Sequence, residues 1–265
     1  MSLPRLCAAA LIVFSQSASA HEFWIEPTDF QVESGMPLIA NLKNGQEFQG
    51  NDLAYFSTST TRFDVIADGK TTAVEGRMGD RPALDMTAGD DGLVVIVHET
   101  TPSRLKYKTW EKFLKFVKHK DFKNIEARHA ALDAPKTDFR ESYTRHTKAL
   151  VAVGDGAGSD AAYGLETEFV ALTNPYAPDF QGDMRVKLLL NGDPRADAQV
   201  EVFDRSATGD VTITLHSTDD KGIASIPVTA GHDYLFDAVH LQPYTGETDA
   251  VWQTLWAALA FHVPK

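Results

Sequence analysis

A histidine that directly follows a secretory leader is the residue of this chain best placed to bind a metal. Arg5 begins the leader, Leu6–Phe14 forms its apolar core, and residues 18–20 end it with the small side chains of an A-x-A cleavage pattern. Cleavage after residue 20 makes His21 the first residue of the mature chain. Its free α-amino group and its ring Nδ1 can then close one chelate ring around a transition metal.

Two further histidines are candidate donors to the same ion. His98 and His240 each end a strongly apolar strand, in VVIVHET and LFDAVHLQP. Strand ends beside loops are where rigid scaffolds present ligands, although a histidine there can equally be a half-buried hydrogen-bonding residue. The sequence leaves open which of the two approaches His21.

Composition restricts the kind of metal and the kind of partner. The single cysteine, Cys7, lies inside the leader, so nitrogen and oxygen donors must hold any metal, and nickel, cobalt and copper are the candidates. With 25 basic and 37 acidic residues the chain carries a net charge of −12, which predicts no nucleic-acid partner. After the leader no apolar run reaches the roughly 20 residues of a membrane span, so we expect a periplasmic protein.

Motifs of enzymes are missing from the sequence. It contains no G-x-S-x-G elbow, no H-E-x-x-H pair, no P-loop and no Rossmann glycine pattern. We therefore predict that the protein is not an enzyme.

The pattern of apolar residues predicts a mainly β fold with two sandwich domains. Residues 21–102 hold short strands, such as Leu38–Leu42 and Leu93–Val97, between turn clusters typical of an immunoglobulin-like sandwich. Residues 165–265 return to strands, and Asn191-Gly192 predicts a hairpin between Val186–Leu190 and Gln199–Phe203. The order NGDPRADAQVEVF…STDDKGIASIPVTAGHDYLFDAVH resembles a transthyretin-like sandwich.

Residues 103–153 are predicted to form a helical insertion between the two sandwiches. Trp110, Phe113 and Val117 recur at helical spacing behind a possible Thr109 cap, and Asp121 is a candidate cap for a second helix. Asp138 followed by Glu141 resembles a capping box. The stripe of a third helix would then contain Phe139, Tyr143, His146 and Leu150, with His146 in the core.

Three segments together resemble a known periplasmic family. They are HEFWIEP after the leader, ESYTRHTKALVAVGD, and DAVHLQP…DAVWQTLWAALAFHV near the end. The family is labelled as the periplasmic component of cobalt or nickel transport, or nickel-uptake substrate-specific-region-like. The resemblance implies an exported two-sandwich protein of transition-metal acquisition, with His21 and His240 matching the family's histidines. It also implies a metal transporter or an outer-membrane receptor as partner.

Three functions are compatible with these features. The first is a metal carrier or accessory factor of uptake, in which His21 chelates the ion and His240 or His98 joins. The second is an adhesive or scaffold protein, in which His21 has no special role. The third is a copper oxidative enzyme, because an N-terminal histidine brace on a β-sandwich is also how lytic monooxygenases look.

Overall fold

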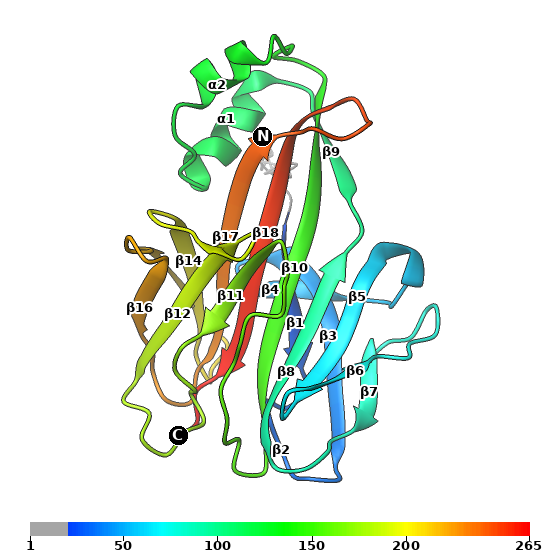
Figure 1. Cartoon of the computed structure of the whole chain (residues 1–265), viewed down its shortest axis with the longest axis vertical. Coiled ribbons are helices and arrows are strands. Elements are labelled where there is room, and N and C mark those ends of the chain that lie inside the picture. Colours follow the sequence, from blue (N-terminus) through cyan, green and yellow to red (C-terminus); the bar gives the residue numbers. More distant parts are fainter. Residues whose placement is uncertain (1–20) are drawn as a thin grey trace, which may run out of the picture.

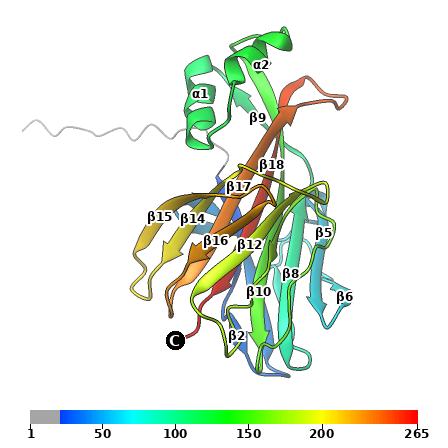
Figure 2. The ribbon, with the colours of Figure 1, turned by 60° about the vertical axis from the view of Figure 1, so that its left-hand side comes forward.

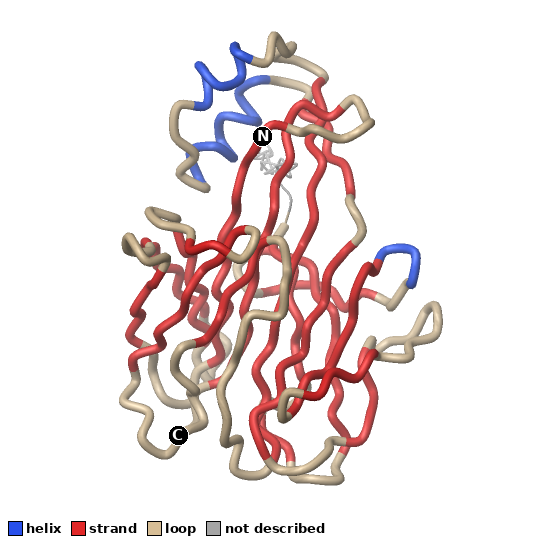
Figure 3. The backbone as a smooth tube through the Cα atoms, in the orientation of Figure 1, coloured by secondary structure: helices blue, strands red, loops and turns tan. Residues whose placement is uncertain are grey.

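The fold is mainly β, as predicted, in a computed structural model that describes residues 21–265. The leader and its cleavage site lie outside the described residues. In the described part no helix is both long and apolar enough to cross a membrane. Figure 3 shows that strands make up most of the backbone and that the two α-helices gather at one end.

A ten-stranded sheet, here the central sheet, runs through the whole molecule (Figure 1). Its main path is β15 (Val211–Ser217), β14 (Gln199–Arg205), β17 (Asp233–Pro243), β18 (Ala250–His262), β10 (Phe139–Val153), β8 (Gly92–Thr100), β5 (Thr60–Ala67) and β6 (Lys70–Ala73). The strands β2 (Gln31–Val32) and β9 (Ser103–Tyr107) also pair with β10. A short 3-10 turn, η1 (Ser57–Ser59), precedes β5.

Two smaller sheets cover opposite faces of the central sheet. The N-terminal sheet contains β1 (Glu22–Pro27), β3 (Pro37–Gln46), β4 (Gln49–Leu53) and β7 (Leu84–Thr87). The C-terminal sheet contains β11 (Thr167–Ala171), β12 (Asp183–Leu190), β13 (Asp193–Pro194) and β16 (Ile223–Pro227). Strand β8 serves both cores, since Val94 and Ile96 face the N-terminal sheet while Val95 and Val97 face the C-terminal sheet. The continuous apolar run in this strand is thereby explained.

The two predicted sandwiches share the central sheet. Strand β10 pairs antiparallel with β8 from the first half and parallel with β18 from the second half. The two halves are therefore joined by continuous backbone hydrogen bonding and not by a linker. The boundaries at residues 102 and 165 stay a prediction.

Two helices cover one end of the central sheet, as Figure 2 shows. Helix α1 (Trp110–His119) begins behind Thr109, whose hydroxyl accepts from the Lys112 amide as predicted. Helix α2 (Ile125–Ala131) begins after Asn124, so the predicted Asp121 cap is wrong. The helices bury their apolar faces against aromatic side chains of β9, β10 and β18, namely Tyr107, Phe139, Trp252 and Trp256.

The predicted third helix is wrong, because residues 139–153 form the longest strand, β10. Asp138 has a left-handed φ of 57° and its carboxylate pairs with Lys106, so it caps nothing. Strand β10 is buried on both faces, which removes the alternation that marks a half-exposed strand. The helical part of the insertion is therefore confined to residues 110–131 of the predicted 103–153.

The Asn191-Gly192 turn is present, but one strand of the predicted hairpin is not. Both residues have positive φ, 53° and 84°, as a two-residue hairpin turn requires. The turn joins β12 to the two-residue strand β13. Gln199–Phe203 pairs instead within the central sheet, as part of β14.

Candidate functional site

The first two residues of the predicted mature chain are held in place by the protein around them. The Arg145 guanidinium donates from Nη2 to the backbone oxygen of His21 at 3.0 Å. Glu22 lies opposite Gly45 in the β1–β3 ladder, and its backbone oxygen accepts from Asn44 at 3.1 Å. His21 itself is partly exposed. An imidazole at this position therefore starts from a fixed backbone.

The side chain of Glu22 points inward to a buried group of charges, here the Lys120 cluster. Lys120, which caps the C-terminus of α1, brings its Nζ to 2.6 Å from Glu201 and 2.9 Å from Asp237. The same Nζ is 3.7 Å from Glu22. All four side chains are buried, and His119 reaches Glu201 from the outside at 3.3 Å.

The carboxylates of the Lys120 cluster have very different pKa values. Burial raises the pKa of Glu22 to about 7 despite the charge of Lys120, and burial also raises that of Asp237. For Glu201 burial acts in the same direction, but hydrogen bonds from His119 and Lys120 outweigh it and lower the pKa to about 2. These carboxylates hold the pKa of Lys120 above its usual value in spite of burial. The lysine therefore stays charged at neutral pH.

The centre of the three carboxylates is filled by the ammonium of Lys120, where a bound cation would otherwise lie. Within residues 21–265 the structure contains no group of three or more His, Cys, Asp or Glu side chains arranged to hold a metal ion. The carboxylate of Glu22, the residue next to His21, is directed to this lysine. Any metal at the terminus must therefore rely first on the two nitrogens of His21.

His98 lies on the face of the central sheet that β1 covers. Its ring sits between Phe23 and Phe63, with ring centroids 5.4 and 5.1 Å away. Its Nε2 is 3.2 Å from the Thr60 hydroxyl, and its Nδ1 has no hydrogen-bond partner among the described residues. Burial lowers its pKa to about 3, so the ring is neutral. His98, Phe23 and Arg145 also line a small pocket of about 130 Å³.

His240 lies on the other face of the central sheet. In β17, Asp237 points to the face covered by β1, where Lys120 contacts both Asp237 and Glu22. Its neighbours Phe236 and Ala238 point to the opposite face, toward the C-terminal sheet. Because side chains alternate along a strand, His240 points with Phe236 and Ala238. Burial, and then the charges of Arg195 and Arg128, lower its pKa to about 4. The sheet thus separates His240 from the side on which His21 starts.

His146 is buried as predicted, but it is not satisfied as a core histidine usually is. Neither ring nitrogen makes a hydrogen bond of good geometry within the described chain, its contact with the Trp256 backbone is weak, and its Nε2 is 3.8 Å from Glu99. Burial lowers its pKa to about 4. Because a neutral imidazole in the core gains a proton when the chain unfolds, acid lowers the free energy of unfolding at this position.

The two buried histidines should each contribute less to stability in weak acid than at neutral pH. Their pKa values in the folded chain, about 3 and about 4, lie below the usual 6.5. At any pH between the folded and the usual value, each histidine therefore binds more protons in the unfolded chain than in the folded chain. Lowering the pH from 7 to 5.5 should remove about 1.2 kcal/mol per histidine. Other buried groups also respond over this range, and Glu22, with its pKa raised to about 7, responds in the opposite direction, so the effect of His146 is measured by comparison. In urea unfolding at both pH values, His146→Met should lose about 1.2 kcal/mol less than the native chain. An unchanged pH response in His146→Met would contradict the assignment; His216→Gln, on the surface, is the control.

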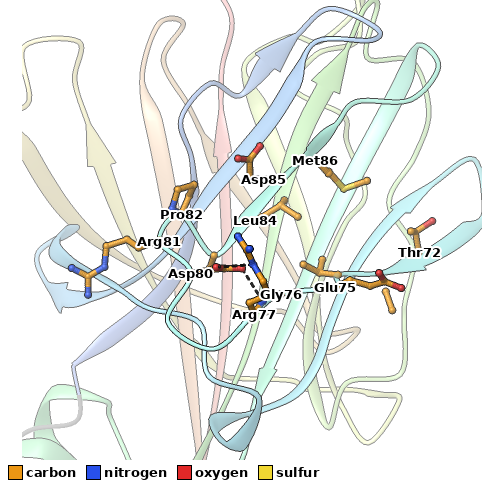
Figure 4. Close-up of a pocket in the computed structure, with 13 residues that line it drawn as sticks. Thr72, Glu75, Gly76, Arg77, Asp80, Arg81, Pro82, Leu84, Asp85 and Met86 are labelled. Carbon is orange, nitrogen blue, oxygen red and sulfur yellow. Dashed lines mark hydrogen bonds and ion pairs between the residues drawn. The ribbon is translucent and has the colours of Figure 1, made fainter.

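A larger hollow lies elsewhere, between β6 and β7. It has a volume of about 550 Å³ and is lined by residues 72–77 and 80–86 (Figure 4). Arg77 turns back to Asp80, whose carboxylate accepts from the Arg77 amide at 2.7 Å. The other charged side chains that line the hollow are of both signs, namely Glu75, Arg81 and Asp85. None of the predicted metal-binding histidines lines this hollow.

Fold and site together define a mainly β protein whose N-terminal strand is anchored on a central sheet beside a buried charge cluster. The profile of the family described as "Domain of unknown function (DUF4198)" matches residues 18–242. The chain therefore belongs to the DUF4198 family. No curated protein matches it.

Similar solved structures are remote in sequence. The D0-D1 domain of intimin shares 9% identity at a TM-score of 0.24, covering 90% of this chain and 97% of its own. A tetra-tandem repeat from the extending region of a large adhesion protein shares 14% identity at a TM-score of 0.20, and the match covers 91% of this chain and 49% of the repeat structure. A mutant Salmonella alpha-2-macroglobulin shares 12% identity at a TM-score of 0.22, and the match covers 97% of this chain and 16% of the macroglobulin. At these values the similarities carry no argument about function.

Proposed function

We propose that the protein is an exported, non-catalytic carrier that binds nickel, cobalt or copper as cargo at its mature N-terminus. The observation that carries the proposal is the fixed position of His21. Its backbone oxygen is held by Arg145, and the next side chain, Glu22, is buried in the Lys120 cluster. Once the leader is removed, the α-amino group and Nδ1 form a donor pair on a rigid strand. The resemblance to the cobalt and nickel transport family supports the same function.

A metal ion bound by only this donor pair can be transferred to another protein. Two nitrogens from one residue leave the remaining coordination positions to ligands from a transporter or an outer-membrane receptor. The neutral ring of His98 is the better candidate for a further protein donor, because it lies on the side of the sheet that β1 covers. The acidic net charge of −12 raises the local concentration of cations.

Extending the chain by one residue before His21 tests the proposal. The extra residue converts the α-amino group into an amide and removes one of the two nitrogens. Calorimetry should show about one ion per native chain, with Cu(II) bound more tightly than Ni(II) and Ni(II) more tightly than Co(II). The extended chain should bind roughly 100-fold more weakly. Intact mass must first confirm that the native chain begins at His21.

Equal affinity of the native and extended chains would overturn the carrier proposal. His216→Ala, which removes a surface imidazole without touching the terminus, is the matched control for adventitious binding. It should leave the affinity unchanged.

A scaffold function is the second candidate, and the central sheet favours it. Backbone pairing through β10 joins both halves into one body, as a rigid spacer needs. In that case saturating Ni(II) or Cu(II) should change neither the melting temperature nor the binding of a partner.

A further inference from the structure

Strand β15 forms an open edge of the central sheet. Within the described chain it pairs with β14 on one side and with no strand on the other. Figure 2 shows β15 and β14 standing out at one side of the molecule. An unpaired edge presents a row of backbone N–H and C=O groups that a further strand can join.

The sequence of this edge lacks the features that usually prevent such pairing. Residues 211–217 read VTITLHS, with no lysine, no carboxylate and no proline. The β14–β15 register runs without a bulge from Gln199↔Ser217 to Arg205↔Val211. Ile213 and Leu215 share one face and are 40% and 60% exposed. By contrast, the opposite edge, β6, is a four-residue strand that begins with a lysine.

We propose that β15 pairs antiparallel with β15 of a second copy, about a two-fold axis through Thr214. In this register Ile213 lies opposite Leu215 of the other copy, and Thr212 lies opposite His216. Beside the axis, each cross-strand pair then joins apolar to apolar or polar to polar side chains, and only at the strand ends does Val211 lie opposite Ser217. A two-fold axis perpendicular to the sheet keeps the Ile213 and Leu215 side chains of both copies on one face, so the central sheets of the two copies become continuous.

Charge favours this edge as the meeting point of two copies. Each chain carries a net charge of −12, so two copies repel each other over most of their surfaces. Strand β15 carries no formal charge with His216 neutral. Asp210, just before the strand, would lie opposite Thr218 and not opposite another carboxylate. The association should therefore strengthen as salt screens the remaining repulsion.

A single cysteine tests the register directly. The mature chain contains no cysteine, so Thr214→Cys places one thiol on the proposed axis, directly opposite its own copy. Directly opposed residues of antiparallel strands have Cα atoms about 4.5–5.5 Å apart, within the reach of a disulfide. Under mild oxidation Thr214→Cys should form a covalent dimer. Thr212→Cys, equally exposed but four positions from its own copy, should not.

Sedimentation velocity tests the association without a cross-link. The native chain should be a dimer that dissociates on dilution, and Leu215→Lys should weaken it at least tenfold, because it places a lysine opposite the apolar Ile213 on each side of the axis. Met78→Lys adds the same charge at an exposed site away from the edge and should leave the dimer unchanged. Melting curves of the variants check that each is folded. A native chain that stays monomeric at all concentrations and salt levels, or equal cross-linking of the two cysteine variants, would overturn the proposal.

Discussion

Replacing Lys120 by methionine should destabilise the protein by about 3–5 kcal/mol, because it leaves buried carboxylates without their cation. Lys120 lies within 3.0 Å of Glu201 and Asp237, both almost fully buried, and also attracts Glu22. The loss can be measured as a shift of the urea midpoint at constant m-value. Methionine keeps most of the side-chain volume, so the loss reports the charge and not a cavity.

Two comparisons make this result specific to the Lys120 cluster. Lys118→Met removes an exposed lysine from the last turn of the same helix and should change stability by less than about 0.5 kcal/mol. Adding Asp237→Asn and Glu201→Gln to Lys120→Met should restore part of the loss, because the uncompensated charges are then gone. If Lys120→Met were as stable as Lys118→Met, the cluster would not hold α1 to β1 and the central sheet.

Most strands could be predicted because local patterns determine them. The apolar runs at 38–42 and 93–97 lie in β3 and β8, and turn residues such as Asn191-Gly192 do adopt positive φ. Strand β10 could not be identified in this way. Its apolar spacing fits a helix as well as a strand, and only its content of β-branched and aromatic residues pointed to a strand. Tertiary burial on both faces decided the outcome.

The Lys120 cluster could not be predicted, because its members are far apart in sequence. Lys120 meets residues 81 and 117 positions further along the chain. In the sequence it resembles the neighbouring surface lysines of α1. It turns inward only because the helix ends there and the next residue, Asp121, has a left-handed φ of 56°. No local signal marks such a position.

The placement of the histidines was predictable in part. In β17 the side chains of Tyr234, Phe236 and Ala238 face the C-terminal sheet, and alternation along the strand places His240 on the same face. Which histidine lies on the side of β1 depends on how the small sheets cover the central one. That topology brings His98, and not His240, to the face covered by β1. The sequence alone contains no information on this choice.

Replacing Lys148 by methionine should also cost about 3–5 kcal/mol, and it should release the loop between β10 and β11. The Nζ of Lys148, buried in the middle of β10, bonds to Asp160 at 2.8 Å and Glu168 at 3.2 Å. It also donates to the backbone oxygens of Ala161 and Phe169, at 3.0 and 2.9 Å. Methionine leaves two buried carboxylates and two carbonyls without this donor.

Amide hydrogen exchange separates the local effect from the global one. Residues 160–165 should exchange faster in Lys148→Met under conditions in which the strands of the central sheet stay protected, because this lysine ties the loop to the sheet. Lys106→Met breaks the exposed Lys106–Asp138 pair and should change neither the urea midpoint appreciably nor the exchange of the loop. A loop that stayed equally protected in both variants would show that Lys148 is not its anchor. Both lysines pair with aspartate at similar distances, 2.7 and 2.8 Å, so the contrast between them rests on the burial of Lys148 and on its further bonds to Glu168 and two backbone oxygens.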